Sequence, residues 1–488
     1  MLLATPIFAG FVVYAGAGVV KIAGLQQGCT GEVLLISSGP AVMVVQVQRD
    51  DFFSLSLGCL ALGSAGSVLL ILGSLASRTQ SLSGVKAGSW LVGSLIGPDG
   101  ASLFRHSTPP PTTFPIPWLI EAPAPGIVTR VSVSEPLPSG ILAVDSMVPV
   151  GQGQRELVVG DRQTGKTSIG LDTILNQHGL GVLCFCAAVG QKALSTLTVC
   201  LALASHGAFG YASISLASAS ASAVSQFLCG YRTSAMAEFF MWAQKCACFV
   251  FYDDLCKHAV AYRELSLLLR RPPGREAFPG EIFFVHSRLL ERSCKLHFGL
   301  GGGSITAVPV IETLAGDVSG YIVSNVISIT DGQIFLCTDL FLSSIRPAVD
   351  VGLSVTRVGS AAQTASMRQV GGAYKIELAQ YFELEAFSQF ASDIGGYSQR
   401  LLARGERLVA LLHQFPANPL SSSQQVRALS LAHQPFFLLL SRQDLKALCV
   451  LILTLPEWLS IVVSAKSICL SLRQLLLPCR SQGVSGPL

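Results

Sequence analysis

The chain has 488 residues, enough for two or three domains that each bury a core, and only 13% of them are charged. Its net charge of +4 comes without a basic run, which excludes a strong electrostatic grip on nucleic acid. Its 14 cysteines form no CxxC pair, which favours buried thiols in a reducing compartment over zinc ligands.

Residues 1–86 predict a small β-barrel, because short apolar segments rich in β-branched residues are divided by Gly and Ser. Two charge-free stretches, 2–20 and 52–77, approach the length of a membrane span, so an integral membrane protein is one alternative. Glycines and serines interrupt the second stretch, which favours turns between strands. The first residues match neither a secretory signal nor a transit peptide. We therefore expect a protein made where it works, or a sequence that is incomplete at its start.

Residues 87–360 predict an α/β nucleotide-binding domain. A Pro-rich patch at 108–117 marks a surface loop. From 154 to 359, apolar runs alternate with helix-like segments, which is typical of a parallel sheet flanked by helices. Residues 361–488 predict a helical domain, because strong helix formers follow one another with few breakers before Pro416, and the tail from 426 to 479 also favours helices.

The most informative motif follows the strand predicted at 155–159. Eight residues satisfy the phosphate-loop pattern GxxxxGK[ST]: Gly160, Asp161, Arg162, Gln163, Thr164, Gly165, Lys166 and Thr167. In such a loop, backbone N–H groups converge on phosphate oxygens at the N-terminus of a helix. Lys166 would neutralise the β- and γ-phosphates, and the Thr167 hydroxyl would bind magnesium. The motif predicts a site for ATP or ADP with magnesium.

An acidic residue at the end of a buried strand should orient the magnesium ion. Asp253 directly follows the apolar run 248–252 and is the predicted residue, with Asp254 as the alternate. The simpler alternative is a surface Asp pair that begins a loop.

Hydrolysis also needs a residue that polarises the attacking water. The strand predicted at 182–189 leads into Gly190, Gln191 and Lys192, and the neutral amide of Gln191 cannot accept a proton. The site should bind MgATP and turn it over poorly, although glutamine orients water in some GTPases. Arg357 lies between a strand and a glycine turn, where it could enter a neighbour's site as an arginine finger. The alternative is a solvated surface arginine.

Together these motifs resemble the alpha subunit of F-type, proton-translocating ATP synthases. The resemblance is dense from Glu121 to Leu408. The segments that carry it are 121–126, 151–157, 160–167, 252–255, 267–280, 286–292, 327–334 and 357–363. It implies a β-barrel, then a RecA-like P-loop domain with a parallel sheet, then a helical domain. It also implies three alpha and three beta subunits alternating in a ring around a gamma rotor stalk, held by delta and peripheral-stalk subunits.

The resemblance also assigns roles in proton-gradient-driven ATP synthesis. Catalysis would occur mainly on the beta subunits, which carry a glutamate where this chain has Gln191. Arg357 would act in the catalytic site of the adjacent beta subunit, with Ser354 near it. Gln414 would lie beside the adenine, but Pro416 replaces the second glutamine that the family usually has there. The family usually begins with a polar segment that binds the delta subunit, and from its first residues we expect this chain to lack it.

Segments 119–125, 145–147, 190–193 and 383–393 are similar to the plastid and cyanobacterial branch of that family. This implies a peripheral protein on the stromal face of the plastid thylakoid membrane. The alternative location is the matrix face of the mitochondrial inner membrane. The competing function is a ring-forming RecA-like NTPase motor, such as an RNA translocase, which should carry a glutamate in place of Gln191 and basic loops facing its pore.

Overall fold

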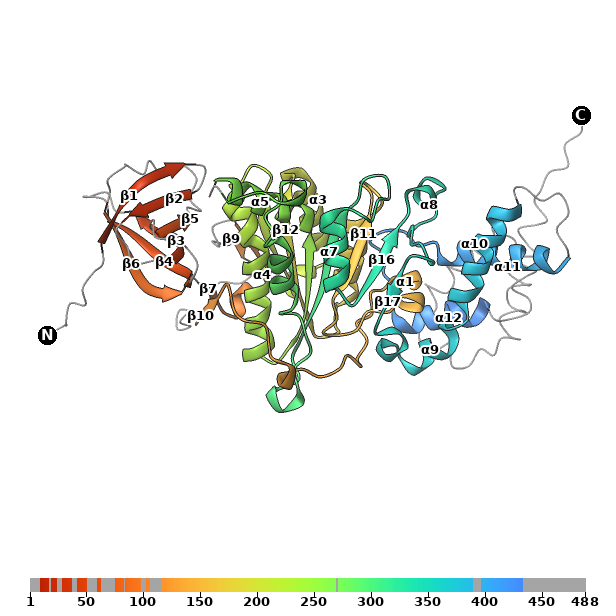
Figure 1. The fold of residues 1–488 in the computed structure, drawn as a ribbon. Coiled ribbons are helices and arrows are strands. Elements are labelled where there is room, and N and C mark those ends of the chain that lie inside the picture. The colour runs from red at the N-terminus through yellow and green to blue at the C-terminus, as the bar shows by residue number, and fades with distance from the viewer. Residues whose placement is uncertain are drawn as a thin grey trace, which may run out of the picture.

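The structure is a computed structural model of the chain. It describes residues 9–16, 19–23, 29–36, 42–50, 59–62, 75–82, 84–97, 102–105, 116–268, 271–388 and 396–432. The six N-terminal strands, the central α/β region and the last helices follow one another along the molecule, with the sheet in the middle (Figure 1). The predicted loop at 108–117 lies mostly outside the described residues, as does the predicted helical tail after Ala432.

Six N-terminal strands close into a barrel in the order β1-β2-β5-β3-β4-β6. Their bounds are β1 (Ala9–Gly16), β2 (Val19–Ala23), β3 (Cys29–Ile36), β4 (Val42–Asp50), β5 (Cys59–Leu62) and β6 (Leu75–Leu82). The predicted barrel is therefore confirmed. A two-stranded antiparallel sheet of β7 (Gly84–Ala87) and β10 (Ile116–Leu119) follows it.

A nine-stranded sheet forms the centre of the molecule, in the order β17-β16-β11-β15-β14-β12-β13-β8-β9. The strands from β16 to β8 run parallel, and the short edge strands β17 and β9 are antiparallel to their neighbours. Their bounds are β8 (Ser94–Ile96), β9 (Ser102–Arg105), β11 (Glu156–Gly160), β12 (Val182–Gln191), β13 (Ala212–Ser218), β14 (Ala247–Asp253), β15 (Ser304–Glu312), β16 (Gly332–Leu336) and β17 (Val355–Thr356). This arrangement confirms the predicted parallel sheet.

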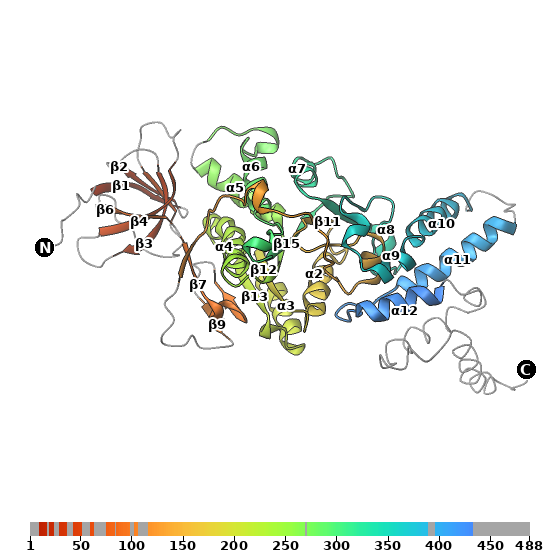
Figure 2. The same cartoon turned by 90° about the horizontal axis from the view of Figure 1, so that it is seen from below.

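Helices cover both faces of this sheet, because its strands are apolar on both sides. In β14, Val250 and Tyr252 pack toward one hydrophobic core, while Phe249 and Phe251 pack toward the other. One face carries α4 (Ala223–Ala243), α5 (Leu255–Leu268), α6 (Ile282–Leu290) and α7 (Tyr321–Ile329). The other carries α1 (Leu142–Met147), α2 (Lys166–Asn176) and α3 (Ala193–Ser205), and the short α8 (Thr338–Leu342) follows β16. The view from below separates α4 and α5 from α2 and α3 (Figure 2).

The last described elements are helices, as predicted: α9 (Ala365–Gly371), α10 (Tyr374–Ser388), α11 (Gly396–Leu412) and α12 (Ser422–Ala432). They pack on the α1 side of the sheet, where Tyr374, Leu408 and Leu429 join the same core as α1 and α2. Within the described residues, no helix combines the length and apolarity needed to cross a membrane. The limits 1–86, 87–360 and 361–488 for the three domains remain predictions.

The apolar cysteine-containing runs lie in the sheet. Cys184, Cys186 and Cys248 are buried and carry free thiols. Burial raises the pKa of each of these thiols above its ordinary value, which keeps them protonated. No group of three or more His, Cys, Asp or Glu side chains suited to a metal ion occurs in the described part of the chain.

Candidate nucleotide site

A cleft of about 1000 Å³ opens at the carboxyl ends of the parallel strands. The loop after β11 and the ends of β12, β14 and β15 form one part of its wall. Segments from much later in the chain, around Arg346 and Gln414, form another part. Ligands of open α/β sheets bind at this edge, so the position of the cleft is that of a ligand site.

The phosphate loop crosses from β11 to α2. At Gly160 an added Cβ would lie 2.9 Å from the Cβ of Leu336, so this glycine permits close packing of the loop on β16. Gly165 has φ 92°, in the left-handed region, and it precedes α2 without any side chain capping that helix. The first N–H groups of α2 are thus left for an anion, and the helix dipole favours negative charge there.

Asp161 braces the loop and does not line the cleft. Its carboxylate accepts hydrogen bonds from Thr313 Oγ1 (2.6 Å), Gly316 N (2.9 Å) and Thr338 Oγ1 (2.9 Å). Although desolvation opposes them, these bonds hold the pKa of Asp161 below its ordinary value. The carboxylate thereby ties the loop to the segments that follow β15 and β16.

Lys166 has its ammonium inside the loop, where it donates to the carbonyl oxygens of Gly160 (2.9 Å) and Asp161. Desolvation lowers the pKa of Lys166, and the surrounding carboxylates of Glu312, Asp254 and Asp253 oppose that shift. A cation held against neutral carbonyls at a helix N-terminus is positioned to pair with an incoming phosphate.

Three predicted residues meet at the far side of the loop. Thr167 Oγ1 donates to Asp253 Oδ2 at 2.9 Å, and Gln191 Nε2 donates to Asp253 Oδ1 at 2.7 Å. Burial raises the pKa of Asp253, and the hydrogen bonds from Thr167 and Gln191 and the charges of nearby lysines oppose the rise. The amide of Gln191 is therefore directed at the carboxylate, which it holds in place.

Asp254 plays a different part from its neighbour. Its Oδ1 accepts the backbone N–H of Lys257 at 2.7 Å, and its Oδ2 lies 3.3 Å from the Lys257 ammonium. It therefore caps the start of α5. Asp253, at the end of the apolar run, is the residue of the pair that contacts Thr167.

Gln414 lies at the opposite end of the cleft, where it lines the wall together with Pro416. Its Nε2 donates to the carbonyls of Gly140 and Asn418, both at 2.8 Å, and its Oε1 accepts from Leu142 N at 3.2 Å. The amide thus fastens its own segment to the turn before α1. Pro416 supplies an apolar wall beside it.

Ser354 and Arg357 lie outside this cleft. Ser354 is fully buried, and its hydroxyl accepts the N–H of Phe335 at 3.0 Å. Arg357 is exposed, and no acceptor or acid among the described residues pairs with its guanidinium. Its backbone N–H donates to the carbonyl of Asp331 at 2.8 Å.

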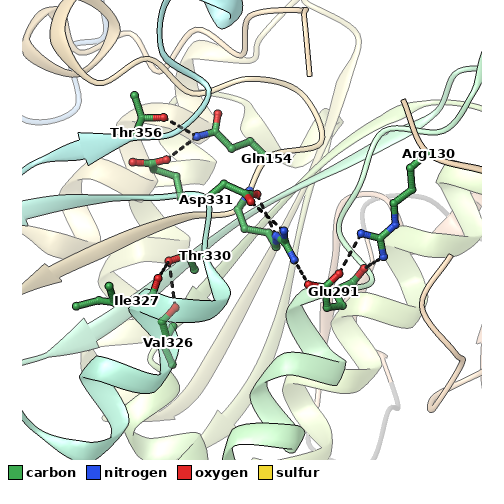
Figure 3. Close-up of polar contacts among 10 residues, drawn as sticks. Arg130, Gln154, Glu291, Val326, Ile327, Thr330, Asp331 and Thr356 are labelled. Carbon is green, nitrogen blue, oxygen red and sulfur yellow. Dashed lines mark hydrogen bonds and ion pairs between the residues drawn. The ribbon is translucent and has the colours of Figure 1, made fainter. Parts of the chain in front are cut away.

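A network of ion pairs supports the segment that bears Arg357 (Figure 3). Arg155 holds the carboxylate of Asp331 at 2.9 and 3.0 Å and also pairs with Glu291, which Arg130 contacts at 3.0 Å. Gln154 Nε2 donates to Thr356 Oγ1 at 2.9 Å, next to Arg357. These contacts fix the base of an arginine whose charged end is in solvent.

Sequence reasoning missed several lining residues, among them the charged or aromatic Asp172, Glu312, Phe341 and Arg346. Glu312 ends β15 and lies 3.4 Å from the exposed Arg162 of the loop, and the end of an apolar run was a signal that could have found it. Arg346 stacks over the ring of Phe341 at 4.9 Å. No local sequence pattern marks Phe341 and Arg346 as site residues, because only the order of strands in the sheet brings them to the cleft.

The residues present fit magnesium and a nucleotide. A hydroxyl and a carboxylate in contact, Thr167 and Asp253, are hard oxygen donors of the kind that magnesium prefers. The uncapped start of α2 and the Lys166 ammonium suit phosphates, and the apolar wall with Phe341 and Pro416 suits a base. Bound magnesium would neutralise phosphate charge there.

The sheet and this cleft define a RecA-like P-loop nucleotide-binding protein. A family model described as ATP synthase alpha/beta family, nucleotide-binding domain, matches residues 140–356. A second, described as ATP synthase alpha/beta chain, C terminal domain, matches residues 363–452. Together the two matches span more than half of the chain, which belongs to the ATP synthase alpha/beta family. It is therefore a nucleotide-binding subunit of a catalytic head.

Proposed function

We propose that the chain is the alpha subunit of an F-type ATP synthase. In this proposal its own site holds MgATP without hydrolysing it, and Arg357 completes the catalytic site of the adjacent beta subunit during proton-gradient-driven ATP synthesis. The observation that carries the proposal is the amide of Gln191, which donates to Asp253 at 2.7 Å. An amide so engaged cannot take a proton from water, although the phosphate cradle around it is complete.

In the chain's own site, each residue would have a binding role. The start of α2 and Lys166 would hold the phosphates, while Thr167 and Asp253 would hold magnesium. Gln191 would keep the Asp253 carboxylate oriented. Glu312 lines the same cleft, but its partner is Arg162 at 3.4 Å. These residues would bind the phosphates and magnesium, and none of them is a free base that could activate water.

The exposed guanidinium of Arg357 supports the second half of the proposal. An arginine finger must leave its own domain and reach a phosphate held by another subunit. Its backbone is fixed by Asp331, while no described acid binds its side chain. Ser354, three residues earlier, would support the same segment through its bond to Phe335.

Exposed apolar side chains support the proposed assembly with beta, gamma and delta or peripheral-stalk subunits. Leu194, Leu197 and Leu201 are 75, 52 and 61% exposed and lie along one face of α3. Ile127 and Val128 are more than 90% exposed. Apolar surface of this extent is typical of faces that a partner covers. We also propose, from the resemblance alone, a peripheral location on the stromal face of the thylakoid membrane.

The decisive experiment is ATP turnover by a reconstituted alpha–beta ring. Arg357→Ala should lower turnover by about 10³-fold or more, since an arginine finger contributes that much. Nucleotide bound to this chain should remain. Arg400→Ala, at an exposed arginine of α11, is the matched control and should keep wild-type turnover. Gln191→Glu should give the isolated chain turnover that its wild type lacks.

The competing hypothesis, a RecA-like NTPase motor, predicts the opposite results. If the isolated wild-type chain hydrolyses ATP unaided and Arg357→Ala changes nothing in the ring, the protein is an independent NTPase. Loss of bound nucleotide in Arg357→Ala would also contradict the proposal, because the arginine would then belong to the chain's own site.

A further inference from the structure

Asp172 lies in the middle of α2, on the wall of the cleft. It follows Lys166 by six residues, which places it about 9 Å further along the helix axis. Only 5% of Asp172 is exposed, and its Oδ1 accepts the backbone N–H of Ala417 at 2.6 Å. One helix therefore contacts the phosphate end of the cleft with its first turn and the segment 414–417 with its second.

Ala417 needs such a contact. It has φ 60°, in the left-handed region that residues with a Cβ rarely adopt. A conformation of this kind persists only where neighbouring contacts impose it. Gln414 fastens the same segment on its other side, through Gly140 and Leu142.

The segment is thus attached twice. Gln414 ties it to the turn before α1, and Asp172 ties it to the helix that bears the phosphate loop. Pro416, which lines the cleft, lies between these two attachments. The position of the apolar wall opposite the phosphates depends on both.

We propose that Asp172 is a positioning residue for the nucleobase, because it holds the segment 414–417 over the base end of the cleft. The inference deepens the nucleotide site and rests on the proposed binding of MgATP there. It requires that affinity for a nucleotide depend on Asp172 while affinity for the phosphates alone does not.

The test compares two ligands on the full-length chain by calorimetry: MgATP, and magnesium tripolyphosphate, which has no base. Asp172→Ala should weaken MgATP about tenfold, the effect of losing one charge-assisted hydrogen bond. Tripolyphosphate should bind within about twofold of wild type. Asp172→Asn should bind MgATP nearly as wild type does, since its amide oxygen still accepts from Ala417. Thr173→Val, which removes the neighbouring hydroxyl on α2, is the control for damage to the helix.

Two further variants keep Asp172 and change Ala417, the residue whose N–H it accepts. The test therefore does not depend on whether the Asp172→Ala variant folds. Ala417→Pro removes the N–H, and its ring cannot adopt φ 60°, so the segment should be displaced and the same split between ligands should follow. Ala417→Gly keeps the N–H, relieves the left-handed strain and should bind MgATP as wild type does.

The inference is overturned if Asp172→Ala leaves MgATP binding unchanged or weakens both ligands equally. It is also overturned if the wild type binds MgATP no more tightly than tripolyphosphate. That result would contradict a contribution from the base but would still agree with phosphate binding at the loop. A wild type that binds neither ligand would refute the proposed site itself.

Discussion

The pKa of a buried carboxyl group in this protein depends on how far its hydrogen bonds offset desolvation. Three hydrogen bonds keep Asp161 ionised despite desolvation. At Asp172 the balance is reversed: desolvation raises its pKa from 3.8 to about 6, and the bond from Ala417 and the charge of His206 oppose the rise only in part. Compared with the unfolded chain, the folded state therefore favours the protonated form of Asp172.

This shift predicts a pH-dependent stability. Below pH 3.8 the group is protonated in both states, and as the pH rises toward about 6 the unfolded chain ionises first. The free energy of unfolding of the wild type should then fall, relative to Asp172→Asn, by up to about 3 kcal/mol. Urea unfolding of both proteins between pH 4 and 7 measures the difference. A difference that stays constant over that range would contradict the assignment.

Among the elements, α2 links the binding site to the core. Its Gly170 lies against the ring of Phe251 in β14, and a Cβ added there would overlap that ring. This close approach brings the start of α2 to the ends of the strands where Asp253 and Gln191 lie. Contact between a helix and a strand thus sets the separation of Thr167 from Asp253.

Gly170→Ala should therefore destabilise the protein, although alanine is the better helix former. Overpacking a well-filled core costs about 1–3 kcal/mol, which exceeds the helix-propensity gain of about 1 kcal/mol. The matched control is Gly126→Ala, because Gly126 has φ −70° and nothing within 4 Å of an added Cβ. Denaturant unfolding should show the loss in the first variant alone, and equal stability of the two would refute the packing argument.

At the scale of the whole molecule, buried hydrogen bonds join the nucleotide-binding region to the C-terminal helices. Gln425 of α12 donates to Asp145 Oδ2 of α1 at 2.7 Å, and the two residues are 1% and 8% exposed. Ser139 and Gly140 donate to the same carboxylate. Tyr374 and Leu429 add apolar contact to the junction.

Gln425→Ala should weaken this junction by about 1–3 kcal/mol, because a buried carboxylate oxygen loses a donor. The exposed Gln399→Ala on α11 should change stability by less than about 0.5 kcal/mol. Hydrogen exchange measures the effect locally, and amides of α12 should exchange faster in the first variant. Unchanged exchange there would mean that the apolar contacts alone hold the helices.

Much of the fold and of the phosphate end of the site could be predicted from local pattern. Gly160 to Thr167 identify themselves by spacing, and the place of Asp253 follows from the apolar run before it, because the carboxyl ends of parallel strands share one edge. The sequence did not reveal which way side chains turn. Asp161 belongs to the loop, yet its carboxylate binds neighbouring segments and does not line the cleft.

The sequence by itself therefore determined the order of barrel, P-loop domain and helices, and the residues that form the phosphate loop, since these depend on periodicity and spacing along the chain. Only the tertiary structure decided how Gln414 and Ala417 come to the cleft. Gln414 and Gly140 are 274 residues apart, and Ala417 is 245 residues from Asp172. Contacts over such separations depend on strand order and helix packing, which no local pattern encodes.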